Sequence, residues 1–194
     1  ESGASPKCVT GADLVANDEQ LTIECRASSG AADTTAVTIS GFTTDADNFV
    51  KVYVPPAHRH QGVWDDEKYR LSLSARHGVC IKSSDENVHL IGLQLENTSS
   101  GAAGSEGAFW VSATGCEISH CICRRTGTTT GGTAINFFNV PSGGTFEAYN
   151  NLFIGFGYGF SYDHKYDTVV LSGGLYNNTL INTNLYVRFN TGNG

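Results

Sequence analysis

Three stretches of this 194-residue chain can be laid over one another: Glu117-Ile-Ser-His-Cys-Ile-Cys123, Glu147-Ala-Tyr-Asn-Asn-Leu-Phe153 and Gly174-Leu-Tyr-Asn-Asn-Thr-Leu180. An earlier stretch, His89-Leu-Ile-Gly-Leu-Gln-Leu95, fits the same frame. The first residues follow one another by 28, 30 and 27 positions (117−89, 147−117 and 174−147). A repeat of this period, rich in Asn and Gly and without helical periodicity, is typical of a β-solenoid. We therefore predict an all-β fold, a right-handed single-stranded parallel β-helix of about five to six coils with almost no α-helix.

Apolar residues alternate along each stretch and then change parity. Val88 and Leu90 alternate as in a half-buried strand. The parity changes at one position per repeat, which marks a corner where the backbone would adopt a positive φ. The corners hold the residues that tolerate this conformation best: Gly92, His120, Asn150 and Asn177. The next position carries Asn151 and Asn178 in the later repeats, which would stack as an amide ladder.

Further apolar rows repeat along the chain, and we predict that each is buried and stacked coil on coil. One row steps by 26, 25 and 25 residues (135−109, 160−135 and 185−160), and another follows it two residues later. The rows are Phe109, Ile135, Phe160 and Leu185, then Val111, Phe137, Tyr162 and Val187, and, after the corner, Leu93, Cys121, Asn151 and Asn178.

Composition and charge fit one solenoid domain. The chain has 23 Gly, only 4 Pro and no Met, as expected of an all-β chain with many turns. Residues 1–45 resemble an N-terminal cap with the first strands, and residues 46–194 form one continuous set of coils. A net charge of −7 argues against a nucleic-acid partner, which needs a basic surface. We find no stretch long enough to span a membrane, no signal peptide and no cofactor motif.

Five of the six cysteines fall into two groups. Cys8 and Cys25 flank the first turn and would close it as a disulfide in an oxidising, extracellular setting. Cys116, Cys121 and Cys123 occupy inward positions, where Cys acts as a small apolar residue. A metal site at His120, Cys121 and Cys123 is the alternative, although this spacing matches no recognised zinc pattern.

Several runs carry a resemblance to known proteins: residues 34–44, 49–53, 58–60, 64–65, 68–70, 88–95 and 149–151. They resemble a group of uncharacterised right-handed parallel β-helix proteins, similar in outline to the pectin-lyase-like superfamily. Such chains occur in bacterial surface proteins and phage tail-associated proteins. The resemblance covers residues of roughly 12 to 194 and implies a location outside the cell, on a cell or virion surface. It transfers no catalytic residue.

Glu117 and Glu147 are the first candidates for chemistry. They share an outward position on consecutive coils, which would place them about 4.8 Å apart. Two such carboxylates suit a cation site or the acid pair of a glycoside hydrolase. The alternative is two solvated glutamates whose side chains splay apart, because His89 and Gly174 interrupt the column on either side.

A second charged cluster runs from Asp163 to Asp167. Within it Asp163 and Lys165 are weak catalytic candidates, and the cluster would bind a sugar or a cation unless it is a solvated turn. The adjacent pair Arg124-Arg125 is expected at the surface rather than as a lyase base. The loop with His58-Arg-His60, Trp64 and Asp65-Asp66 is the most enzyme-like by composition, and packing of this loop against the first coils explains it equally well.

Two sequons begin at Asn97 and Asn177. Asn177 lies at the corner, so a glycan is expected rather at Asn97, which we place at the start of an exposed loop.

Two function classes remain. One is a structural or adhesive extracellular solenoid. Because the C-terminal coil has no polar cap, the solenoid either assembles head to tail into a fibre or is a truncated monomer with a frayed last coil. The other is a polysaccharide lyase or hydrolase acting in a surface groove, for which carbohydrate is the partner. The coils carry no dense acidic and basic constellation, so the sequence favours the first class.

Overall fold

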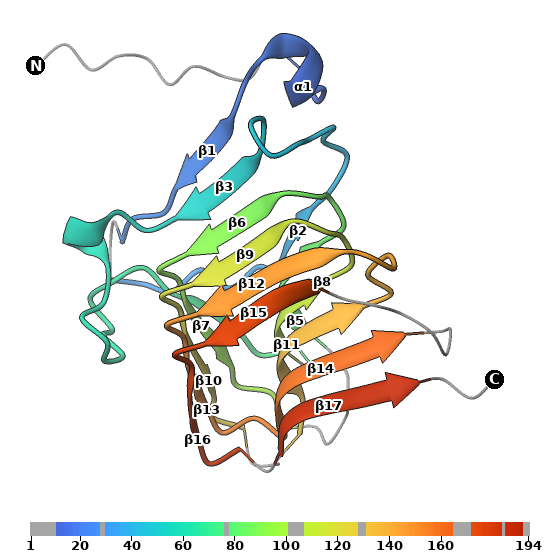
Figure 1. Cartoon of the computed structure of the whole chain (residues 1–194). Helices are drawn as coiled ribbons and strands as arrows, with labels where there is room; N and C mark the ends of the chain where they lie inside the picture. The colour runs from blue at the N-terminus through green and yellow to red at the C-terminus, as the bar shows by residue number, and fades with distance from the viewer. Residues whose placement is uncertain are drawn as a thin grey trace, which may run out of the picture.

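The computed structural model is a parallel β-solenoid of about five turns whose strands form three parallel sheets (Figure 1). It describes residues 11–27, 30–75, 78–100, 107–127, 131–164, 172–183 and 185–191, with the backbone alone for 164 and 185–191. The predicted fold class is confirmed. Among the described residues, no helix is long and apolar enough to cross a membrane.

Each complete coil contributes one strand to each sheet. The first sheet has the order β1 (Leu21–Glu24), β3 (Val50–Tyr53), β6 (Val88–Ile91), β9 (Cys116–Ser119), β12 (Thr145–Tyr149) and β15 (Ser172–Tyr176). The second has β4 (Leu71–Leu73), β7 (Gln94–Asn97), β10 (Ile122–Arg125), β13 (Leu152–Ile154) and β16 (Thr179–Ile181). The third has β2 (Val37–Ile39), β5 (Val79–Ser83), β8 (Gly107–Val111), β11 (Thr133–Phe138), β14 (Tyr158–His164) and β17 (Leu185–Thr191).

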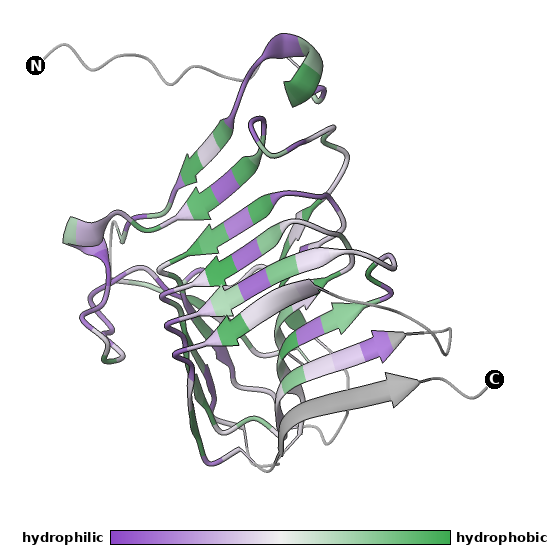
Figure 2. Cartoon of the chain, in the orientation of Figure 1, coloured by the Kyte–Doolittle hydropathy of each residue, from purple (hydrophilic) through white to green (hydrophobic). Residues whose placement is uncertain are grey.

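The core lies between the three sheets and is built from the inward-facing side chains, which are every second residue of each strand. On the first sheet Val88, Leu90 and Ile118 are all at most 1% exposed. Figure 2 shows the resulting alternation of hydrophobic and hydrophilic residues along these strands. Burial of alternate residues is what a pleated strand requires when one face packs on a core.

The predicted corner between the first two sheets is confirmed. Gly92 has φ 73°, His120 and Asn150 have φ 55°, and Asn177 has φ 54°. Each turns the chain from a strand of the first sheet into a strand of the second. The residue type at this position is therefore set by backbone conformation, since few L-residues tolerate positive φ.

The amide ladder after the corner is also confirmed. The Asn151 side chain is 2% exposed, and its Nδ2 donates to the Ile118 carbonyl at 2.9 Å and to Asn178 Oδ1 at 3.0 Å. Its Oδ1 accepts from the Cys121 backbone N–H at 2.9 Å. Leu93 and Cys121 in the same row are buried, whereas Asn178 in the last coil is only half-buried.

The predicted register of the third sheet is right for three coils and wrong for the last. Ile135 pairs with Phe109 and with Phe160, as predicted. Phe160 then pairs with Val187, and Leu185 pairs with Tyr158. The error is two residues, and a shift of two preserves the period of the alternation and therefore leaves the apolar pattern of the sequence unchanged. The predicted burial of Leu185 and Val187 lies outside the described side chains.

The N-terminal end carries a short helix, α1 (Leu14–Asn17), capped by the Asp13 side chain. Leu14 is fully buried, and its backbone N–H donates to the Thr43 carbonyl at 3.0 Å. Strands β1 and β2 pair in register with β3 and β5, so the first strands already belong to the sheets. The second sheet begins only at β4 in the next coil.

Candidate functional site

The outward row of the first sheet holds the two glutamates singled out by the sequence. His89 pairs with Glu117, Glu117 pairs with Glu147, and Glu147 pairs with Gly174. The shared outward position of the two carboxylates on consecutive coils is therefore confirmed. The row appears in Figure 2 as a hydrophilic band across the middle of these strands.

Glu117 is held by its neighbours on three sides. Its Oε1 accepts from the Tyr149 hydroxyl at 2.6 Å and from the Ser119 hydroxyl at 2.8 Å. Its Oε2 lies 3.8 Å from His89 Nδ1. The hydrogen bond to the Glu117 carboxylate raises the pKa of Tyr149, and burial adds to the increase. Burial lowers the pKa of His89, and the charge of Glu117 opposes this only in part.

Glu147 has the equivalent partner one coil further on. Its Oε2 accepts from the Tyr176 hydroxyl at 3.5 Å. The rings of Tyr149 and Tyr176 stack with centroids 5.0 Å apart and planes within 2° of parallel. Each glutamate is therefore linked to the tyrosine of the following coil, and these contacts run along the solenoid axis.

This arrangement joins coils rather than leaving reactive groups free. A carboxylate that accepts a tyrosine hydrogen bond has fewer lone pairs left for a cation or a proton. Among the described residues, no group of three or more His, Cys, Asp or Glu side chains is placed to hold a metal ion. The use of Glu117 and Glu147 as an acid pair or a cation site stays a prediction.

The second candidate cluster is only partly described. Asp163 lies near the end of β14, and its Oδ2 accepts from Asn136 Nδ2 on β11 at 2.9 Å. Lys165 lies outside the described residues. The structure therefore does not test the pair, but it adds Asn136 to the surroundings of Asp163.

The most enzyme-like loop, which we call the strap (residues 55–70), lies against the outer face of the second sheet. It starts with a short 3₁₀ helix, η1 (Pro56–His58). His60 Nε2 lies 2.8 Å from the carbonyl oxygen of the corner residue His120. Gln94, which is fully buried, bonds the strap backbone at Asp65 and Tyr69 through three hydrogen bonds of 2.7–3.1 Å. Packing on the coils accounts for the composition of this loop.

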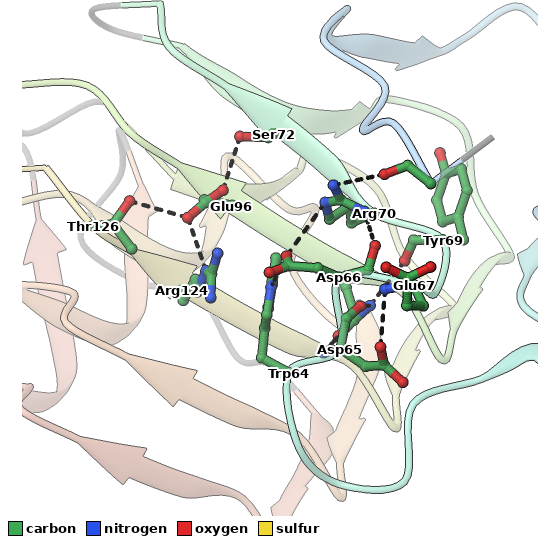
Figure 3. Close-up of polar contacts among 12 residues, drawn as sticks. Trp64, Asp65, Asp66, Glu67, Tyr69, Arg70, Ser72, Glu96, Arg124 and Thr126 are labelled. Carbon is green, nitrogen blue, oxygen red and sulfur yellow. Dashed lines mark hydrogen bonds and ion pairs between the residues drawn. The ribbon is translucent and has the colours of Figure 1, made fainter. Parts of the chain in front are cut away.

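The strap closes over one charged pair (Figure 3). Glu96 is 8% exposed and accepts from Arg124 Nε at 2.8 Å, from the Ser72 hydroxyl at 2.9 Å and from the Thr126 hydroxyl at 3.1 Å. The Arg124 guanidinium lies over the Trp64 ring, 3.7 Å from its centroid. Three coils and the strap thus meet at one buried carboxylate, which the sequence analysis missed.

The expectation that Arg124 and Arg125 form a surface pair is wrong. Arg124 is partly covered by Trp64. Arg125 pairs in register with Asn97 and is 5% exposed, because it shares the inward parity of Cys123.

Asn97 is likewise buried, so the prediction that it begins an exposed loop is wrong. It ends β7 and is 1% exposed. Its Nδ2 donates to the Gly78 carbonyl at 3.0 Å, and its Oδ1 accepts from the Ser99 backbone N–H at 3.0 Å. A glycan on Nδ2 is incompatible with this packing.

The inward cysteines are placed as predicted. Cys116, Cys121 and Cys123 are all at most 4% exposed, and Cys80 lies with them in the core. Burial raises the pKa of the Cys116 thiol to about 11 and of the Cys121 thiol to about 12. These thiols act as apolar core groups. Cys25 is half-buried, and Cys8 lies outside the described residues, so their disulfide stays a prediction.

A cavity of about 460 Å³ opens at the N-terminal end of the solenoid. Its lining is mostly apolar and includes Leu21, Ile23, Phe42 and Tyr69, with Cys25 among them. It lies where a coil before β1 and β2 would cover the core. No pattern in the sequence predicts this cavity directly, because its apolar residues follow the same alternation as those of the middle coils.

Comparison with known proteins found no family model, no curated relative and no solved structure that matches this chain. The structure confirms the parallel β-solenoid fold that the resemblance predicts, whereas the comparisons identify no family.

Proposed function

We propose that this chain is a structural β-solenoid that associates head to tail, with the N-terminal end of one copy docked on the C-terminal end of the next. The observation that carries the proposal is the exposure of core positions at both ends. Among the described residues, no strand pairs with the outer edges of β1 and β2 or with those of β15, β16 and β17. Unpaired edges above an apolar core are templates for another chain.

At the N-terminal end, inward-facing apolar side chains reach solvent. Ile23 is 42% exposed and Val37 is 39% exposed, although both occupy rows that are buried in the next coil. Helix α1 lies at the corner, where the Leu14 backbone N–H donates to the Thr43 carbonyl. Ile23 and Val37 themselves line the apolar cavity at this end.

At the C-terminal end, the same rows are again only half covered. Leu175 on β15 and Leu180 on β16 are partly exposed, although they face inward and pack on the core. Tyr176 on β15 is 44% exposed, and its ring stacks on that of Tyr149 on one side. A following coil would cover all three.

The two ends match in register. If the first sheet continued from one copy to the next in the register it keeps within the chain, Ile23 would lie beside Leu175 and Glu24 beside Tyr176. Glu24 already accepts a hydrogen bond of 3.2 Å from a tyrosine in its own copy, Tyr53. Apolar residues would thus meet apolar residues, and a phenol would meet a carboxylate.

Such a contact joins two different surfaces and need not close, so it propagates as a filament. The contacts of Glu117 and Glu147 support the structural function class over the polysaccharide-processing one. Each carboxylate already accepts a hydrogen bond from a tyrosine of the next coil. An adhesive role and a location on a cell or virion surface are part of the proposal and rest on the sequence resemblance.

Two edge variants test the joint by light scattering and sedimentation of the 194-residue chain. Ile23→Lys places a charge on the N-terminal end, and Leu175→Lys places one on the C-terminal end. We expect the unmodified chain to form concentration-dependent oligomers and each variant alone to be monomeric. A mixture of the two should give dimers and nothing larger, because each variant keeps one intact end.

Val63→Lys, at a strap residue that is 69% exposed, is the matched control and should oligomerise normally. Far-ultraviolet circular dichroism checks that every variant is folded. A chain that is monomeric at millimolar concentration overturns the proposal. Dimers of Ile23→Lys alone would also overturn it, because they would mean that like ends meet.

A further inference from the structure

Among the described residues, three oxygen atoms on the outward face of the third sheet are buried and have no hydrogen-bond partner. They are Asn136 Oδ1, Ser161 Oγ and Asp163 Oδ1. Asn136 is 8% exposed and Ser161 is 1% exposed, although both point away from the apolar core. Buried polar atoms in folded proteins are almost always satisfied by protein groups, ordered water or an ion.

These residues converge on one place. Asn136 on β11 pairs in register with Ser161 on β14. Asp163 lies two residues beyond Ser161 and so points to the same side of the strand. The hydrogen bond of 2.9 Å from Asn136 Nδ2 to Asp163 Oδ2 ties the ends of the two side chains together.

The chemistry of the three atoms selects the ligand. A carboxylate oxygen and an amide oxygen only accept hydrogen bonds, and a hydroxyl oxygen also has lone pairs to offer. Leaving each of them unsatisfied destabilises the folded state. A ligand that accepts electron pairs from all of them is a hard cation, since Ca²⁺ is bound by carboxylate, amide and hydroxyl oxygens and water.

We propose that Asn136, Ser161 and Asp163 form a Ca²⁺ site on the third sheet, with water completing the coordination. This site is separate from the joint between copies and from the Glu117–Glu147 row on the first sheet. With a single carboxylate among its protein ligands, it resembles weak extracellular calcium sites, whose Kd values are about 0.1–1 mM.

The walls of the site provide an optical probe. Trp110 on β8 pairs in register with Asn136 on β11 and so lies in the same row. The Trp110 ring packs against the Phe138 ring, with centroids 4.8 Å apart. Lys82 lies further along that row, and its ammonium group is directed over the Trp110 ring at 5.5 Å. Tb³⁺ takes calcium sites and luminesces when a nearby indole is excited. Trp110 should therefore sensitise a bound Tb³⁺.

The first measurement is thermal unfolding of the full chain in EDTA and in 10 mM CaCl₂. We expect Ca²⁺ to raise the Tm by roughly 3–6 °C. Asp163→Asn should abolish this rise. Glu147→Gln, which neutralises a carboxylate on another sheet, should keep it. Equal Ca²⁺-induced rises in the unmodified chain and in Asp163→Asn would overturn the site, as would the absence of any rise in the unmodified chain.

The second measurement uses Tb³⁺ luminescence with excitation of tryptophan. The Tb³⁺ luminescence should fall at least fivefold in Trp110→Phe, whereas Trp64→Phe should retain it. Added Ca²⁺ should displace the bound Tb³⁺ and so remove the luminescence. Arg188 occupies the register position beside Ser161 on β17 and is the competing explanation, since a guanidinium would also neutralise Asp163. If Arg188→Ala creates a Tb³⁺ signal that the unmodified chain lacks, the arginine and not a cation occupies the site.

Discussion

The middle coils and the two ends of this solenoid carry apolar residues in the same rows, yet these side chains are buried in the middle coils and partly exposed at the ends. In one inward row of the first sheet, Leu90 and Ile118 are each 1% exposed, whereas Ile23 at the N-terminal end is 42% exposed. Leu175, in the same row of the last coil, is half-buried. The local alternation is equal in all of these strands, so burial depends on a neighbouring coil on each side.

This difference follows from nearest-neighbour packing. In a solenoid each coil contacts only the coils before and after it, so an end coil makes half the stacking contacts of a middle one. The strap adds to the contrast on the second sheet. It covers Gln94, which is fully buried, while Ile181 in the last coil is 44% exposed. The stability of the fold should therefore be concentrated in the coils around β6 and β9.

The largest expected contrast comes from one substitution made at two positions of the inward row. Leu90→Ala should lower the free energy of unfolding by about 2–5 kcal/mol, because it leaves a cavity in a filled core. Leu175→Ala should cost about 1 kcal/mol in dilute, monomeric protein, since its site is already open to solvent. Urea denaturation followed by circular dichroism measures both. Equal losses at the two positions would break the comparison.

The amide ladder gives the next contrast. Asn151→Ala removes bonds to the Cys121 N–H and the Ile118 carbonyl, which stay buried. We expect a loss of about 2–3 kcal/mol. Asn178→Ala should cost about 1 kcal/mol, because Asn178 is half-buried in the last coil. The same urea titrations test this, and a loss at Asn178 as large as that at Asn151 would contradict it.

The sequence predicted the rows of this fold well where backbone conformation restricts residue type. The corner was found because Gly92, His120, Asn150 and Asn177 tolerate positive φ and most other residues do not. The last register failed because apolar alternation has a period of two, so a shift of two residues preserves it. The spacing of 27 residues from Glu147 to Gly174 also holds from Phe160 to Val187, so the step of the first sheet predicts the last register of the third sheet better.

The site residues were predicted less well, for two different reasons. Arg125 and Asn97 are polar, so composition placed them at the surface, although both follow the inward parity of Cys123 and Leu95. Their alternate position along the strand, two residues after an inward-facing apolar residue, is the signal that predicts their burial. The contact between Trp64 and Arg124 joins positions 60 residues apart (124−64) through an irregular loop. No periodic pattern encodes a contact of that kind.

We expect the strap to make the stability of the middle coils sensitive to pH through His60. His60 is 8% exposed, and burial lowers its pKa, opposed in part by the hydrogen bond to the His120 carbonyl. The folded protein thus binds this proton less readily than the unfolded chain, whose histidine pKa is about 6.5. The stability that neutral His60 contributes is fully present above about pH 6.5 and is lost as the pH falls through the lowered folded pKa.

We therefore expect the urea midpoint to fall between pH 7 and pH 5 and to fall less steeply in His60→Gln. His58→Gln, at an exposed position of the same loop, is the matched control and should keep the slope of the unmodified chain. A slope that is unchanged in His60→Gln would mean that other groups set the pH dependence, for example His89, whose pKa burial also lowers.

The smallest expected effect is that of the ring that closes the strap. Trp64→Leu keeps an apolar side chain over the second sheet but removes the face on which the Arg124 guanidinium lies at 3.7 Å. Arg124 retains its bond of 2.8 Å to Glu96, so only the ring contact is lost. Cation–π contacts at partly exposed sites are worth about 0.5–1 kcal/mol, and we expect a loss of that size in urea denaturation. Ile181→Ser, on the uncovered part of the same face, should change stability by less than about 0.5 kcal/mol. If Trp64→Leu costs no more than Ile181→Ser, the ring contact between Trp64 and Arg124 adds nothing to the stability of the middle coils.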